Sequence, residues 1–198
     1  FGTTLDCPHI NYSTIQSIEN HKFEPVSFLY WRSRKLDFST INSLIKSLEK
    51  SSQIPQLIKT QNTRDENLLK YLASSDLIKN NLNTYDSVKL LWEISTIPDY
   101  LKNYDFSYSN DLIKIFTNVF DCGNINLDWA KSEAKKLQNI EGSIDMLTYR
   151  LSKIRFWNYI SNKKDWFSNN IELHSLSKET EKILSSALHK RLTEQFVD

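Results

Sequence analysis

Glycine is scarce in this chain of 198 residues, which holds only Gly2, Gly123 and Gly142. The loops that hold nucleotide phosphates in the common binding motifs need two or more glycines within a few residues of one another. The three glycines are spaced too widely for such a loop. The sequence therefore contains no recognisable nucleotide site, and we expect no cofactor to bind this chain by itself.

Cysteines and long apolar runs are scarce as well. The two cysteines, Cys7 and Cys122, are too few for the disulfide framework of a small secreted domain, which favours a reducing compartment. No signal peptide is recognisable, and no apolar run approaches the ~18 residues that a membrane span needs. We therefore expect no membrane partner.

Neither sign of charge is in excess. The chain has 25 basic and 24 acidic side chains and a formal net charge of +1, which argues against a freestanding nucleic-acid binder held by a general positive field. Any nucleic-acid contact must therefore come from local patches. Cys7, His9 and His21 lack the paired short spacings of structural zinc sites, and no Ser-His-Asp or Cys-His arrangement can be inferred. We expect neither a metal site nor catalysis by this chain.

Apolar residues recur at helical spacing almost everywhere. Behind Ser39, a candidate N-cap, four apolar residues occupy the i, i+3, i+4 and i+7 positions of one helix face. Thr63, which begins a capping-box pattern, and Thr84 are further candidate caps, and Pro98 should end the helix that follows Thr84. Later helices are expected from Ser109 to Gly123, from Leu127 to Leu137, from Ser143 to about Tyr159, and over residues 183–196. Because no stretch keeps a period of two, we predict an all-α multi-helix bundle.

Aromatic and basic residues are interspersed with helical apolar positions in the last quarter of the chain, in Arg150–Tyr159, Lys163–Trp166 and Ala187–Asp198. Further characteristic stretches lie upstream, at Phe1–Pro8, Ile18–Pro25, Trp31–Ser39, Val88–Glu93 and Ile97–Tyr100. In this order, the stretches resemble the C-terminal region of the mitochondrial degradosome-type RNA helicases and their bacterial relatives. These proteins are a branch of the superfamily-two DExH-box helicases.

The resemblance implies a place in a parent protein. Phe1–Pro8 would be the short strand that closes the second RecA-like motor domain. We therefore expect a strand or extended segment left from the motor over residues 1–11, a first helical subregion over 12–80 and a C-terminal helical bundle over 81–198. Because no stretch keeps a period of two, we expect no sheet beyond this strand. The polar run Lys79–Asn83 supports the last boundary, but it fits a loop within one bundle equally well. A start at Phe1 without a Met, and an end inside a predicted helix, are expected of a piece of a longer chain.

The resemblance also implies a function. The chain would be an accessory helical region that packs on the motor domains and helps to form the channel for single-stranded RNA or DNA, which it would bind weakly alone. ATP and Mg²⁺ would bind, and ATP would be hydrolysed, only in the parent helicase. The alternative is an all-helical protein-interaction module that docks the motor or recruits a partner such as a nuclease, and the near-neutral charge favours it. A bacterial relative would be cytoplasmic, and the mitochondrial matrix is the less favoured location.

The first candidate nucleic-acid patch runs from Arg150 to Trp166. Its cations are Arg150, Lys153, Arg155, Lys163 and Lys164. They could contact phosphates while Phe156, Trp157 and Tyr159 stack on unpaired bases. The favoured alternative is that the rings belong to the core and the cations to a solvated face, because such stripes are usually core.

The second candidate patch combines Arg32 and Arg34 with the rings of Tyr30 and Trp31. It could contact RNA, but docking or core packing is favoured, because protein interfaces are enriched in the same residue types. If the patch packs on the motor domains, Tyr30 and Trp31 should lie on an exposed apolar surface of this chain. The cations of His189–Arg191 have an equally simple explanation, since positive charge is favourable near the end of a helix.

Overall fold

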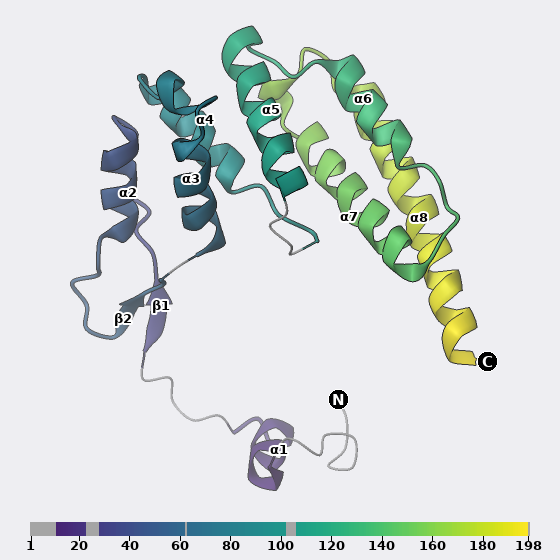
Figure 1. The fold of residues 1–198 in the computed structure, drawn as a ribbon. Helices are drawn as coiled ribbons and strands as arrows, with labels where there is room; N and C mark the ends of the chain where they lie inside the picture. The colour runs from purple at the N-terminus through teal and green to yellow at the C-terminus, as the bar shows by residue number, and fades with distance from the viewer. Residues whose placement is uncertain (1–10, 23–27, 62, 102–105, 198) are drawn as a thin grey trace. The chain divides into compact units, whose positions relative to one another are not determined.

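A computed structural model describes residues 11–22, 28–61, 63–101 and 106–197 of the chain. It is mostly helical, which confirms the predicted all-α class (Figure 1). The α-helices are α1 (Tyr12–Glu19), α2 (Ile41–Glu49), α3 (Arg64–Ser74), α4 (Tyr85–Ser95), α5 (Phe106–Cys122), α6 (Leu127–Lys136), α7 (Ile144–Ser161) and α8 (Ile171–Val197). Two short strands, β1 (Leu29–Trp31) and β2 (Leu57–Lys59), and 3-10 turns at Lys79–Asn81 and Lys164–Trp166 complete the described elements.

The chain divides into two compact units. The first unit comprises Phe1–Ser33 and Glu49–Thr60, and the second comprises Arg34–Leu48 and Gln61–Asp198. The boundary expected between residues 80 and 81 falls inside the second unit, where α3 and α4 on either side of it pack together. The polar run Lys79–Asn83 is thus a loop within one bundle, the alternative that the sequence left open.

The first unit contains α1 and a small parallel sheet. Leu29 pairs with Leu57, Tyr30 with Ile58, and Trp31 with Lys59. Backbone hydrogen bonds extend the pairing at both ends, since Leu29 N donates to Gln56 O at 2.8 Å and Thr60 N donates to Trp31 O at 3.0 Å. The expectation of no further sheet was therefore wrong, because a strand of three residues is too short to show a period of two. The strand expected at Phe1–Pro8 lies outside the described residues.

Several predicted helix ends in the second unit are confirmed. The Thr84 hydroxyl accepts from Ser87 N in a capping box that begins α4, and the Ser143 hydroxyl accepts from Met146 N at the start of α7. Gly123 has a φ of +74°, the left-handed conformation that suits the residue after a helix. Pro98 follows closely after the end of α4 at Ser95.

Other predicted ends were wrong. The cap of α2 is Thr40, whose hydroxyl accepts from Ser43 N at 3.0 Å, rather than Ser39. The predicted position of Thr63 at the N-cap of α3 is confirmed, and only the expected capping is wrong, because its side chain makes no capping hydrogen bond. Helix α5 already includes Phe106, and α8 begins at Ile171, well before the residues 183–196 assigned to the last helix.

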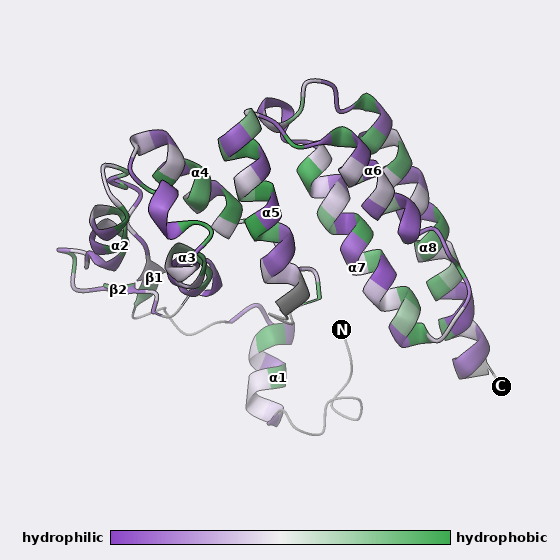
Figure 2. Cartoon of the chain, turned by 45° about the horizontal axis from the view of Figure 1, so that its top comes forward, coloured by the Kyte–Doolittle hydropathy of each residue, from purple (hydrophilic) through white to green (hydrophobic). Residues whose placement is uncertain are grey.

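The second unit has one continuous apolar core. Helix α4 packs on α3 and α5, while α6, α7 and α8 pack on one another and lie side by side in Figure 1. Figure 2 shows hydrophobic and hydrophilic residues interspersed along α7. The buried residues of α7 accordingly include polar ones, namely Ser152, Lys153 and Ser161. Helix α7 therefore lies at the centre of this part of the bundle and carries polar groups into it.

Candidate nucleic-acid and docking surfaces

The aromatic residues of α7 belong to the core. Phe156 and Trp157 are only 2% and 3% exposed. The Trp157 ring meets the edge of Trp129 with 5.3 Å between centroids, and Phe156 meets Tyr108 at 5.8 Å. Core packing, the favoured explanation of these two rings, is confirmed, while Tyr159 is half-buried.

Lys153 forms a buried ion pair between α7 and α5. Its Nζ lies 3.0 Å from Asp111 Oδ2, and the two side chains are 10% and 24% exposed. The same ammonium lies 6.0 Å from the centre of the Tyr149 ring. Two charges this poorly hydrated must satisfy each other, so Lys153 holds α7 to α5 and presents little surface to a phosphate.

Arg150 is tied to the loop between α6 and α7. One guanidinium nitrogen, Nη1, donates to the carbonyl oxygen of Asn139 at 2.9 Å and also to that of Glu141. In the same loop, Glu141 N donates to Asn139 Oδ1 at 2.8 Å. The Arg150 side chain thus fixes the course of the loop over residues 139–141.

Arg155 joins α7 to α8. Its Nε lies 3.0 Å from Glu181 Oε1, and Asn158 Nδ2 donates to Glu181 Oε2 at 2.8 Å, so one carboxylate bridges two residues of α7. Nearby, burial raises the pKa of the Tyr100 phenol, and the charges of Tyr159 and Glu181 raise it further while Arg155 lowers it. The Arg155 side chain is 43% exposed, so it is more accessible to a ligand than Lys153.

Lys163 and Lys164 follow the end of α7. The Lys163 ammonium lies 5.5 Å from the ring centres of both Tyr159 and Trp166, and Lys164 is exposed in a 3-10 turn. Thirteen positions separate Arg150 from Lys163, a rise of roughly 20 Å along a helix axis. The structure therefore spreads the first candidate patch along α7, with its accessible lysines at the far end.

The second candidate patch is also divided. Arg32 is half-buried in the first unit, and Arg34 is exposed in the second. Around Tyr30, however, the predicted exposed apolar surface is present, with Tyr30 73% exposed and Trp31 half-buried. We call the exposed apolar residues of the small sheet and its entrance the strand cluster, which consists of Phe28, Leu29, Tyr30 and Ile58. Within it, the Phe28 and Tyr30 rings meet edge to face with 5.7 Å between centroids.

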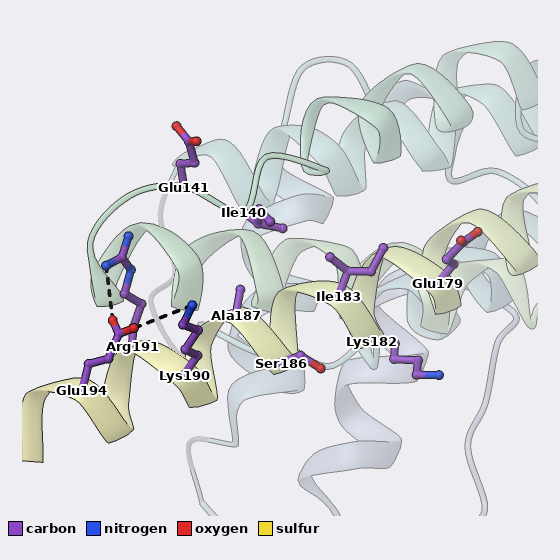
Figure 3. Close-up of a pocket in the computed structure, with 10 residues that line it drawn as sticks. All are labelled: Ile140, Glu141, Glu179, Lys182, Ile183, Ser186, Ala187, Lys190, Arg191 and Glu194. Carbon is purple, nitrogen blue, oxygen red and sulfur yellow. Dashed lines mark hydrogen bonds and ion pairs between the residues drawn. The ribbon is translucent and has the colours of Figure 1, made fainter. Parts of the chain in front are cut away.

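A groove beside α8 was not foreseen from the sequence. It has a volume of about 640 Å³ and runs between α8 and the α6–α7 loop (Figure 3). It is lined by Ile140, Glu141, Glu179, Lys182, Ile183, Ser186, Ala187, Lys190, Arg191 and Glu194. The sequence pattern assigned residues 183–196 to the last helix and left Ile140 in a loop. That Ile140 and Ile183 line the same groove becomes evident only from the position of α8 beside the loop.

The described parts of the chain contain no group of three or more His, Cys, Asp or Glu residues arranged to hold a metal ion. Among the helices described, none combines the length and apolar character that crossing a bilayer requires. Neither a family model, nor a curated protein, nor a solved structure matches this chain.

Proposed function

We propose that this chain is an accessory helical region that docks on a larger protein and carries out no chemistry of its own. The strand cluster is the observation that supports this most strongly. Parallel sheets are normally covered on both faces, and a two-stranded sheet is rarely stable by itself. Here Leu29, Tyr30 and Ile58, three of the six strand residues, are exposed apolar side chains. A sheet of this kind needs a further surface against which to pack.

The resemblance of the sequence suggests which protein supplies that surface. The expected partner is the pair of RecA-like motor domains of an ATP-dependent RNA helicase, which would bind ATP and Mg²⁺. Tyr30 and Trp31 beside Arg32 have the composition of a protein interface, where Tyr, Trp and Arg are enriched. In a bacterium, such an enzyme would work in the cytoplasm.

The first test is to sequence the gene that encodes this chain, in which we expect RecA-like domains upstream of Phe1. The second is to measure binding of this chain to those domains by calorimetry. Exchanging Tyr30 for Ser should weaken binding about tenfold or more, because it removes a large interface side chain. Tyr71→Ser is the matched control, since Tyr71 is 51% exposed on α3 in the other unit. Equal effects of the two changes, or a parent gene without motor domains, would contradict the proposal.

A nucleic-acid contact is the second candidate function, and Lys163 and Lys164 support it. Lys164 is exposed, and the Lys163 ammonium lies near the half-buried Tyr159 ring and the buried Trp166 ring, an arrangement compatible with phosphate contacts. Changing both lysines to Gln should weaken single-stranded RNA binding and make it less sensitive to salt between about 50 and 200 mM. The matched control changes Lys135 and Lys136, which are exposed on α6, to Gln.

Absence of RNA binding at low salt would instead favour the alternative of a protein-interaction module that docks the motor or recruits a nuclease. The internal contacts of Arg150, Lys153 and Arg155 already point in that direction, since cations engaged within the fold contribute less to a surface field. A pull-down with the motor domains and a nuclease as separate baits distinguishes the two kinds of partner.

A further inference from the structure

We propose that the groove beside α8 is a docking site for an amphipathic helix of a partner protein. This partner helix would carry a row of apolar side chains with carboxylates beside the row. The groove lies in the second unit, whereas the strand cluster lies in the first. The two surfaces can therefore bind different partners, and the present proposal does not depend on the proposed function.

The floor of the groove is apolar. Ile140 from the loop and Ile183 from α8 are each 46% exposed, and Ala187 lies one turn beyond Ile183 on the same face. Isoleucine is among the residue types most often buried. Two exposed isoleucines lining one groove provide apolar surface that a partner side chain can cover.

The loop wall of the groove is held in place before any partner binds. The Arg150 guanidinium bonds the carbonyls on both sides of Ile140, and the Asn139 side chain accepts from Glu141 N. Gly142 follows with a φ of +128°, which side-chain-bearing residues rarely adopt. A wall fixed in this way loses little conformational freedom on binding. Arg150 therefore acts here as a positioning residue for Ile140.

The shape of the groove suits a helix. Its α8 residues extend from Glu179 to Glu194, which corresponds to about 22 Å, or roughly four turns, along the helix axis. The groove is bounded by a regular helix and a fixed loop. Amphipathic helices bind in such grooves through apolar residues at i, i+3, i+4 and i+7.

The charges favour carboxylates on the occupant. Lys190 and Arg191 both interact with one carboxylate, that of Glu194, at 3.9 and 3.3 Å. Figure 3 shows the Glu141 side chain directed away from α8. Two cations beside one carboxylate leave positive charge at this end of the groove, which an acidic residue of the partner would neutralise.

The test uses the whole chain and three synthetic peptides of about 16 residues, long enough to span the groove as a helix. The first has Leu on one helical face and Glu beside it, the second has Lys in place of Glu, and the third has Ser in place of Leu. Binding is followed by the fluorescence anisotropy of a label on the peptide. The acidic peptide should bind at least about tenfold more tightly than either of the others. It alone combines apolar side chains for the floor with carboxylates for the cations Lys190 and Arg191.

Variants then locate the binding site. Ile183→Ser should weaken binding of the acidic peptide about tenfold, because it removes part of the apolar floor. Ile171→Ser is the control, since Ile171 is 70% exposed on the same helix outside the groove. Arg150→Gln should weaken binding through the loop, whereas Arg191→Gln should mainly reduce its salt dependence.

Several outcomes would overturn the proposal. One is equal binding of the acidic and basic peptides, and another is an Ile171→Ser effect as large as that of Ile183→Ser. A third is displacement of the peptide by single-stranded RNA in a manner that depends on Lys182, which would make the groove a nucleic-acid contact. Circular dichroism of each variant shows whether the fold is intact. None of these outcomes bears on the strand cluster, so the two proposals can fail separately.

Discussion

Replacing Lys153 with Met removes one charge from the buried pair between α7 and α5. The Lys153 Nζ and Asp111 Oδ2 atoms are 3.0 Å apart, and the lysine side chain is 10% exposed. Methionine keeps most of the length and the apolar stem of lysine, so the packing of the α7 backbone should change little. The variant thus leaves the Asp111 carboxylate without its ammonium partner.

The expected cost follows from the exposure of Asp111. Removing one partner of a buried ion pair costs about 3 to 5 kcal/mol, because the other charge is left uncompensated. Asp111 keeps 24% of its exposure, so water can recover part of that loss, and we expect the free energy of unfolding to fall by about 2 to 3 kcal/mol. For a chain of this size, the melting temperature should fall by roughly 5 to 10 °C.

The assay is urea denaturation followed by circular dichroism at neutral pH, on Lys153→Met, Asp111→Asn and the double variant. Because the two side chains interact, the double variant should be more stable than the sum of the single losses predicts, by about 1 kcal/mol or more. Lys135→Met, at an exposed position on α6, is the control and should change stability by less than about 0.5 kcal/mol. A similarly small loss in Lys153→Met, or additive losses in the cycle, would refute the reasoning.

Two further predictions concern acid stability and the loop glycines. The hydrogen bond and charge of Lys131 lower the pKa of Glu172 below its ordinary value of 4.5. The stabilisation from this pair is therefore present above that pH and lost as the pH falls through the lowered pKa. In melts from about pH 6 to about pH 3, the melting temperature of Glu172→Gln should decline less steeply than that of the unchanged protein, and an equal decline would contradict this prediction. Gly142→Ala should destabilise more than Gly123→Ala, because a Cβ at Gly142 would lie 3.1 Å from Met146 Sδ at a φ of +128°, whereas at Gly123 the φ is +74° and nothing lies within 4 Å. Melting curves should show a loss of about 1 to 3 kcal/mol at Gly142 and about 1 kcal/mol at Gly123, and the reverse order would exclude this explanation.

The helical class could be predicted because local signals and packing agree over most of the chain. The Thr84 cap, the helix start at Ser143 and the helix end at Gly123 are set by a few neighbouring residues, and each is found as expected. The start of α8 was missed because the local apolar pattern does not follow the packing there. Its first half buries polar residues, since Ser177 and Thr180 are 0% and 2% exposed, and a pattern of apolar spacing cannot detect them.

The small sheet and the groove depend on contacts between distant residues. Leu29 and Leu57 pair across nearly thirty positions of intervening sequence, and three residues on each side are too few to suggest a strand. Likewise, Ile140 and Ile183 come together only because α8 packs beside the α6–α7 loop. Sequence spacing within one element therefore could not reveal either surface.

The cations of α7 show how a basic stretch in a sequence can serve the fold. Arg150, Lys153 and Arg155 are close enough in sequence to suggest one phosphate-binding face, yet they contact three different elements: the α6–α7 loop, α5 and α8. Each partner is a carbonyl or a carboxylate that a phosphate would have to displace. Weakened RNA binding after changing these residues would therefore not by itself locate a strand path, because it could equally follow from a loosened bundle. Among the described residues, Lys163 and Lys164 join no two helices through an ion pair, so changing them allows the cleaner experiment.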